Sequence, residues 1–288
     1  MREQTVKCLS AEGFHAMHYV EWGDPTASRV VICVHGLTRN GRDFDELAQA
    51  LAPVCRVICP DIVGRGKSDW LRAKTGYGYP QYCADLTVLL ARVTGADGGT
   101  PPRIYWVGTS MGGILGMLLA ASPKTPIEKL VVNDVGAHIP AASLERLGTY
   151  VGKDPRFKTW RELETYMRVV CAPFGPLTDA QWRHLTEHSA KQHADGSWGM
   201  SYDPGIGIPF QKEDPLEDVD LWRPYEAIRC PTLLLRGAQS DLLLEDTAAQ
   251  MTQRGPKARL VVFDGIGHAP MLMARDQIDT VRDFLLTT

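Results

Sequence analysis

The sequence of 288 residues lacks the features that mark several large classes of protein. It contains no run of about 18 apolar residues, so no transmembrane helix and no membrane partner are expected. The first residues, Met1–Lys7, hold no apolar signal core, which predicts a cytoplasmic location. Internal repeats and low-complexity segments are also missing, which argues against a repeat protein.

An excess of charge of one sign is absent as well. The 31 Lys and Arg residues against 34 Asp and Glu give a formal net charge of −3, so a nucleic-acid partner is not expected. The seven cysteines show no C-x-x-C spacing, and their odd number indicates reduced thiols rather than a disulfide framework. What remains, 44% hydrophobic and 23% charged residues, is typical of a soluble globular protein with one large domain, with or without an insertion.

Short apolar runs recur along the chain and alternate with helical patterns. Runs of this kind are typical of strands buried on both faces of a parallel sheet that helices cover. We predict such strands at residues 30–34, 56–59, 103–107, 130–132, 232–235 and 260–263, and an antiparallel edge hairpin over 4–10 and 14–22. Helices are predicted at 44–51, 81–91, 111–121, 245–253 and 277–286. Together they form an α/β fold with a mostly parallel sheet of eight strands.

The alternation breaks between Gly136 and about Arg229, where helical periodicity continues without a buried-strand run. We predict an all-helical insertion after the sixth strand, with 137–228 as a lid and 1–136 plus 229–288 as the core domain. Because such an insertion starts at the carboxyl ends of parallel strands, it is expected to cover a ligand site. The expected substrate contacts are Trp198, in a loop-like stretch of this segment, and Tyr202, just beyond that stretch.

The most informative motif is G-T-S-M-G at Gly108–Gly112. It follows a run of β-formers and precedes an apolar helical pattern. A serine between two glycines on a strand-to-helix turn is the signature of a nucleophile elbow, in which the positive end of the helix favours an oxyanion. We therefore predict Ser110 as a nucleophile.

A serine nucleophile needs a base and an acid that orients the base. The base candidate is His268, in a loop rich in glycine and proline directly after the last strand. For the acid we favour Asp241, which follows the strand at 232–235 and gives the chain order Ser, Asp, His. Asp134, which also follows a strand, remains the alternative.

The oxyanion that this chemistry creates needs backbone donors. We expect the N–H of Met111, the residue after the nucleophile, and the N–H of Leu37, in the loop after the first buried strand. His35 in the same loop is expected to orient the loop rather than to act as the base.

Five motifs in this order resemble the landmarks of the α/β-hydrolase superfamily, and more narrowly its lidded esterase, lactonase and C–C hydrolase branch. They are His35-Gly36, Asp61–Ser68, Gly108–Gly113, Ser240-Asp241 and Gly267-His268. The resemblance implies an α/β-hydrolase fold with Ser110, Asp241 and His268 as the triad. It also implies that Leu37 and Met111 form the oxyanion hole.

These residues predict a serine hydrolase that cleaves a small carboxylic ester or lactone through an acyl-enzyme, with no metal and no organic cofactor. Three alternatives stay open: a C–C hydrolase of ring-cleavage products, a cofactor-free perhydrolase, and a ligand receptor without catalysis. The small-molecule substrate is the only expected partner, and the protein is expected to be a monomer or a small homo-oligomer. The H-x-x-E-H pattern at His184–His188 is interpreted as a solvated helix face rather than a zinc site.

Overall fold

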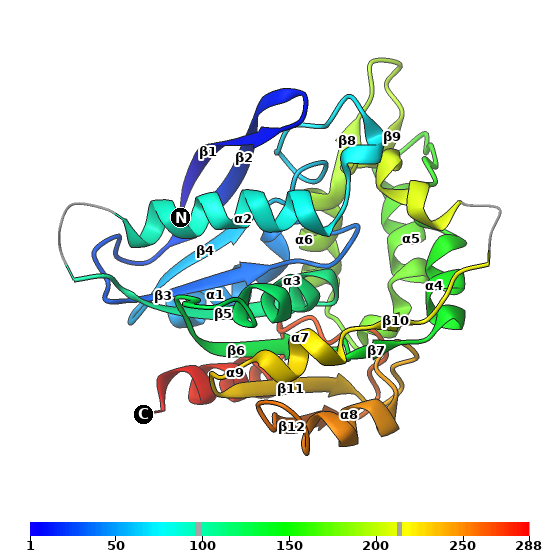
Figure 1. Ribbon diagram of the computed structural model, residues 1–288. Helices are drawn as coiled ribbons and strands as arrows, with labels where there is room; N and C mark the ends of the chain where they lie inside the picture. The colour runs from blue at the N-terminus through cyan, green and yellow to red at the C-terminus, as the bar shows by residue number, and fades with distance from the viewer. Residues whose placement is uncertain (96–99, 212–214, 288) are drawn as a thin grey trace.

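The computed structural model describes residues 1–95, 100–211 and 215–287. Its centre is a sheet of eight strands in the order β1-β2-β4-β3-β5-β6-β11-β12 (Figure 1). The strands are β1 (Arg2–Ser10), β2 (Gly13–Trp22), β3 (Arg29–Val34), β4 (Arg56–Pro60), β5 (Arg103–Thr109), β6 (Ile127–Asn133), β11 (Thr232–Gly237) and β12 (Arg259–Phe263). β1 and β2 pair antiparallel, β2 pairs antiparallel with β4, and the other neighbours are parallel. The predicted fold class and edge hairpin are therefore confirmed.

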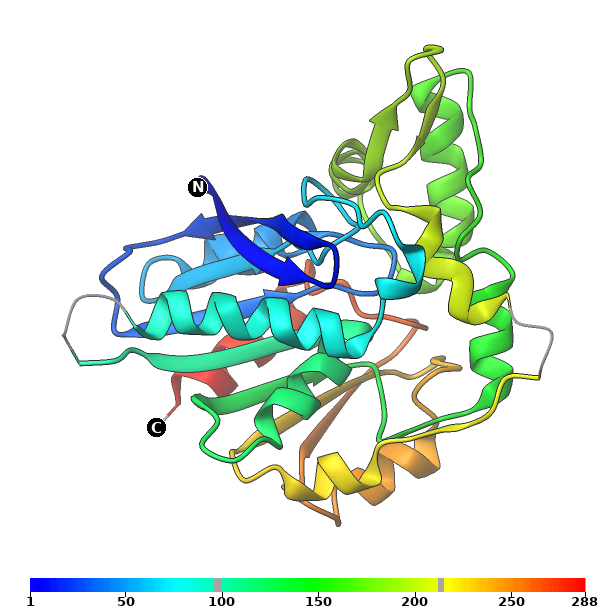
Figure 2. The ribbon, with the colours of Figure 1, turned by 45° about the horizontal axis from the view of Figure 1, so that its top comes forward.

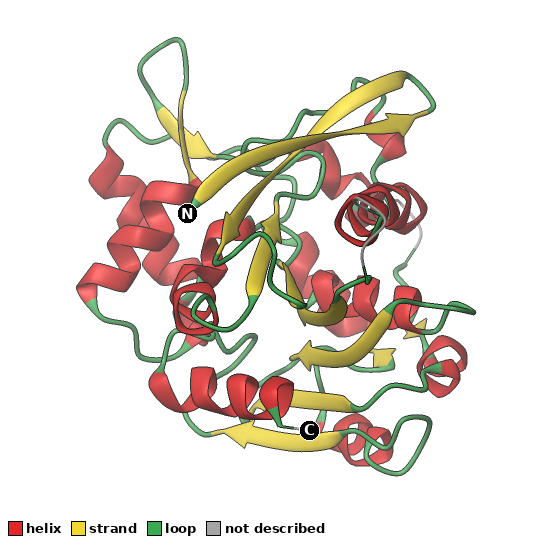
Figure 3. Ribbon diagram, turned by 90° about the vertical axis from the view of Figure 1, so that its left-hand side faces the viewer, coloured by secondary structure: helices red, strands yellow, loops and turns green. Residues whose placement is uncertain are grey.

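Helices cover both faces of this sheet (Figure 3). One apolar cluster joins it to α1 (Asp45–Leu51) and α9 (Arg275–Leu286). A larger cluster joins the other face to α2 (Tyr79–Thr94), α3 (Met111–Ala120), α7 (Trp222–Ala227) and α8 (Glu245–Met251). Residues 30–34 of β3 are all buried, because a central strand of such a sheet meets apolar side chains on either side.

Apart from α7, which packs against the sheet, the segment between β6 and β11 forms a separate group of elements at one end of the sheet (Figure 2). Its helices are α4 (Ala141–Gly148), α5 (Trp160–Val170) and α6 (Asp179–Ser189), with 3₁₀ turns at Ala172–Phe174 and Pro204–Phe210. It also contains two small antiparallel pairs, β7 (His138–Ile139) with β10 (Val219–Asp220) and β8 (Ala190–Gln192) with β9 (Trp198–Met200). The prediction of an all-helical insertion is thus wrong, because strands of two or three half-exposed residues carry no apolar run to detect.

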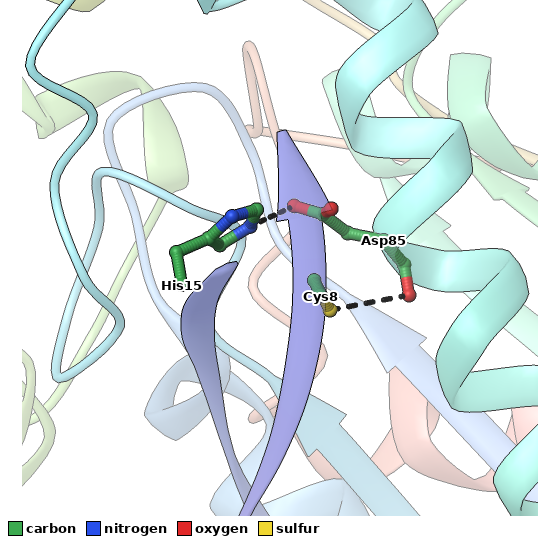
Figure 4. Close-up of side chains that lie close together, drawn as sticks. All are labelled: Cys8, His15 and Asp85. Carbon is green, nitrogen blue, oxygen red and sulfur yellow. Dashed lines mark hydrogen bonds and ion pairs between the residues drawn. The ribbon is translucent and has the colours of Figure 1, made fainter. Parts of the chain in front are cut away.

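A buried polar cluster ties the edge hairpin to α2 (Figure 4). Cys8 and His15 face each other across β1 and β2, and His15 Nε2 lies 2.9 Å from Asp85 Oδ2. Asp85 Oδ1 also accepts a hydrogen bond from Gln81, while burial raises the pKa of the Cys8 thiol to about 12. These groups form a set of three possible metal ligands, but the Asp85 carboxylate already has His15 and Gln81 as hydrogen-bond partners. The cluster therefore serves as a structural link.

In the described part of the chain, no helix combines the length and apolar character that a membrane span requires.

Candidate active site

Ser110 lies on the sharp turn between β5 and α3, with φ 52° and ψ −117°. Such a backbone conformation is strained for a residue with a Cβ and is typical of a nucleophile elbow. The flanking glycines are sterically required. A Cβ on Gly108 would lie 2.1 Å from the carbonyl oxygen of Gly112, and one on Gly112 would lie 1.9 Å from that of Val34. The turn therefore brings α3 against the sheet and exposes Ser110 at the end of β5.

A continuous chain of hydrogen bonds starts at Ser110. His268 Nε2 lies 2.9 Å from Ser110 Oγ, and His268 Nδ1 lies 2.7 Å from Asp134 Oδ2. The Asp134 side chain is fully buried, while that of His268 is 12% exposed. An imidazole held between a hydroxyl and a buried carboxylate can accept the hydroxyl proton and pass it on.

The preference for Asp241 as the acid is wrong in this structure. Asp241 lies in the turn after β11, its side chain is 52% exposed, and its carboxylate pairs with Arg146 instead of His268. Asp134 takes the position beside the histidine because it directly follows β6 with φ 56°, and its N–H donates to the carbonyl of Leu235 on the neighbouring strand.

Fixed hydrogen-bond donors around the Asp134 carboxylate explain why this carboxylate is stable in its buried position beside His268. The Gly237 N–H donates to Oδ1 at 2.8 Å, and the Ser240 hydroxyl donates to Oδ2 at 2.7 Å. A buried carboxylate that accepts several hydrogen bonds is stabilised in its charged form. Ser240 is a site residue that the sequence analysis missed.

Asn133 is a second residue that was missed. Its side-chain amide donates to the carbonyl of Pro270 at 2.7 Å and to the hydroxyl of Thr109 at 3.0 Å. It thereby joins the ends of β5 and β6 to the loop that carries His268. An asparagine directly after the apolar run 130–132 was a signal available in the sequence.

The expected oxyanion donors border the nucleophile. Met111 is the first residue of α3, so its N–H has no acceptor within the helix. The carbonyl of Leu37 accepts a hydrogen bond from Arg65 Nε at 2.8 Å, and the buried Arg65 also donates to the Tyr82 hydroxyl at 3.0 Å. Arg65 thus fixes the peptide of the Leu37 loop. The role of Leu37 and Met111 as an oxyanion hole stays a prediction.

His35 has the surroundings of a loop-orienting residue. Its Nδ1 lies 2.7 Å from the carbonyl oxygen of Gly36, and its Nε2 accepts the N–H of Ile62 at 3.0 Å. Complete burial lowers the pKa of His35 to about 4. The ring is therefore neutral and has both nitrogens engaged, which leaves none free for proton transfer.

Two cavities meet at Ser110, and both are also bordered by Leu37 and by Leu147 of α4. The first, of about 100 Å³, is bordered by His268 together with other polar side chains. The second, of about 300 Å³, is bordered mainly by apolar and aromatic side chains, among them Tyr77, Tyr82, Ile114, Leu144, Phe210 and Leu242. Ser110 therefore has free space on either side.

The structure places the two expected substrate contacts in different surroundings. Tyr202 borders the first cavity, and its hydroxyl donates to the carbonyl of Lys153 at 3.1 Å. Trp198 belongs to β9, where its backbone pairs with Phe157 and its ring packs on the insertion's own apolar cluster. Among the described residues it borders neither cavity at Ser110, so its assignment as a pocket wall is wrong.

The H-x-x-E-H pattern lies on α6, where the rings of His184 and His188 are 4.6 Å apart. The face is half-buried rather than solvated, and the Asp45 carboxylate comes close enough to complete a set of three possible ligands. However, Asp45 is already paired with the Arg42 guanidinium, and His184 Nε2 lies 3.0 Å from the Arg42 carbonyl oxygen. These contacts account for the cluster as an ion-paired junction between α6 and the core.

Comparison with known proteins agrees with the observed fold. The chain is 46% identical over 286 residues to the 3-hydroxybutyrate-oligomer hydrolase of Cupriavidus necator, which covers 97% of this chain and 96% of that protein. The crystal structure of a putative hydrolase from Rickettsia typhi superposes with a TM-score of 0.90 at 30% identity, over 100% of both chains. That of an alpha/beta hydrolase from Novosphingobium aromaticivorans gives a TM-score of 0.84 at 36% identity, over 98% of both. A model of the alpha/beta hydrolase family matches residues 31–280, and the chain belongs to this family.

Proposed function

We propose that the protein is a serine esterase that hydrolyses short linear oligomers of 3-hydroxybutyrate. The observation that carries the proposal is the hydrogen-bonded chain Ser110–His268–Asp134, which opens onto two cavities. It occurs in a chain that is 46% identical to a 3-hydroxybutyrate-oligomer hydrolase over nearly its whole length. The units of such an oligomer are joined by carboxylic ester bonds, which are the bonds that an acyl-enzyme mechanism cleaves.

The proposed reaction begins when Ser110 Oγ attacks the ester carbonyl carbon and passes its proton to His268 Nε2, 2.9 Å away. Asp134 accepts a hydrogen bond from Nδ1, which holds the imidazole in the correct tautomer and stabilises the imidazolium that forms. His268 then donates this proton to the oxygen of the leaving hydroxyl group. Water, deprotonated by the same histidine, hydrolyses the acyl-enzyme and regenerates Ser110.

The negative charge on the tetrahedral intermediate needs donors that are already in place. In the proposed mechanism the N–H groups of Leu37 and Met111 supply them, and Met111 adds the positive end of α3. The hydrogen bond from Arg65 to the Leu37 carbonyl supports this role, since it orients the loop before substrate arrives.

Residues 137–228 act as the lid in this proposal and select the substrate. Leu147 of α4 and Tyr150, which follows this helix, border the first cavity together with Tyr202. The lid is joined to the core through backbone hydrogen bonds from Gly66 N–H to the Ser201 carbonyl and from Asp203 N–H to that of Gly64. A lid held in this way supplies fixed cavity walls.

The direct test is hydrolysis of purified 3-hydroxybutyrate dimer and trimer, followed by chromatographic measurement of the monomer. We expect turnover by the wild-type protein and a loss of several orders of magnitude in Ser110→Ala. A fluorophosphonate should label Ser110 and no other serine, as shown by peptide mapping, because only this serine is activated by a histidine. Ser68 is a suitable internal control, since its buried hydroxyl donates to the Asp61 carbonyl.

Cleavage of lactones or of C–C bonds by the same triad stays an alternative. A panel that contains a four-carbon lactone and a ring-cleavage dienone beside the oligomers distinguishes these activities. A higher kcat/KM for the dienone than for any oligomer would contradict the proposed function.

A further inference from the structure

The position of His268 distinguishes the two cavities at Ser110. His268 borders the first cavity and not the second, among the residues that the structure describes. The group that leaves as an alcohol must receive its proton from this histidine, so its oxygen has to lie on the His268 side. The first cavity is therefore the site of the leaving group, and the larger apolar cavity is the site of the acyl chain.

The leaving-group cavity carries charge at its wall. Arg146, on α4, borders it, and the side chain of this residue is 37% exposed. Arg146 pairs with both oxygens of Asp241, through Nη2 on Oδ1 at 3.0 Å and through Nε on Oδ2. Asp241 itself borders neither cavity at Ser110 within the described chain. The backbone of Asp241 is in turn held by the Ser143 hydroxyl, which donates to its carbonyl at 2.6 Å. Asp241 is thus a positioning residue that lies behind the guanidinium.

A second arginine in this cavity has a different role. Arg39 is buried, and its Nε and Nη2 donate to both oxygens of Asp43 at 2.8 and 2.6 Å. Its remaining nitrogen, Nη1, lies 4.0 Å from the Met167 sulfur. This bidentate pair is buried and anchors the loop after β3, whereas the bidentate pair of Arg146 with Asp241 is partly exposed. Arg146 is the more accessible cation, and a guanidinium has more N–H donors than one carboxylate can accept.

The geometry points to Arg146 as the receptor for the free carboxylate of the leaving 3-hydroxybutyrate unit. The inference rests on the proposed function, in which every linear oligomer ends in one carboxylate. A guanidinium fork matches a carboxylate through charge-assisted hydrogen bonds. With that carboxylate on Arg146, the ester bond at Ser110 is the last one of the chain. The enzyme then removes one monomer at a time from the carboxyl end, while the rest of the oligomer occupies the apolar cavity.

The experiment that isolates this contact compares two small esters, O-acetyl-3-hydroxybutyrate and its methyl ester, by the acetate that each releases. Both have the same acyl group, and only the first has a charged leaving group. We expect Arg146→Gln to reduce the preference for the charged ester, as a ratio of kcat/KM values, by roughly ten- to a hundredfold. Arg146→Lys should restore part of it. Arg103→Gln, which removes an exposed arginine paired with Glu128, is the matched control and should leave the ratio as in wild type.

A trimer labelled with ¹³C in its carboxyl-terminal unit tests the direction of cleavage. The expected first products are labelled monomer and unlabelled dimer. Labelled dimer with unlabelled monomer would overturn the inference, as would an unchanged ester ratio in Arg146→Gln or a loss of preference in Arg39→Lys alone. If the acetyl esters behave as expected while the oligomers are not cleaved, the proposed function fails and the role of Arg146 stands.

Discussion

Replacement of Asp134 by asparagine tests the assignment of the acid most directly. The carboxylate accepts hydrogen bonds from Gly237 N–H on Oδ1 and from His268 and Ser240 on Oδ2. In Asp134→Asn the amide oxygen will face the fixed Gly237 N–H, because the amide nitrogen cannot accept that bond. The nitrogen then faces His268 Nδ1, which has to become an acceptor and leaves the ring proton on Nε2. An Nε2 that carries a proton cannot accept the proton of Ser110.

The expected loss of kcat follows from this change of tautomer. Loss of the productive tautomer lowers kcat by about 10⁴-fold, which corresponds to about 5 kcal/mol of transition-state stabilisation. The assay is steady-state hydrolysis of 4-nitrophenyl acetate, whose neutral groups do not depend on Arg146. Asp241→Asn is the matched control and should lower kcat by less than about tenfold, because its carboxylate is exposed and does not contact His268.

The reverse ranking of the two variants would refute the reasoning. So would an Asp134→Asn protein that is folded, as judged by circular dichroism, and retains more than about 1% of the wild-type kcat. Thermal unfolding of both variants checks that a loss of activity is not a loss of fold.

Two further outcomes are expected. Gly108→Ala should abolish folding or severely lower the melting temperature, since its Cβ would lie 2.1 Å from the Gly112 carbonyl oxygen; a stable variant with wild-type unfolding would contradict this. Asp203→Ala should lower the free energy of unfolding in urea by about 1–3 kcal/mol, because the Tyr77 hydroxyl loses its acceptor at 2.7 Å; no change would mean that water replaces the carboxylate.

The central sheet could be predicted because its signal is local. Strand β3 is apolar at every position after Arg29, and β11 contains the apolar run 233–235; the structure buries both runs. The elbow was also predictable, since glycine spacing, strand and helix all lie within one stretch of sequence around Ser110. The insertion gave a weaker signal. β8 and β9 contain three residues each, and Trp198 lies in β9 where a loop was expected.

The acid could not be decided from the sequence, because the chain order Ser, Asp, His is satisfied by either candidate. β6 and β11 are neighbours, with Asn133 opposite Leu235, so the residues that follow both strands reach the same edge of the sheet. What separates Asp134 from Asp241 is the set of donors that each carboxylate meets. Asp134 meets a backbone N–H, a hydroxyl and an imidazole in a fully buried position, whereas Asp241 meets an arginine at the surface. A buried carboxylate without those donors would be unstable as an anion, so the fold selects the acid through contacts that no local pattern encodes.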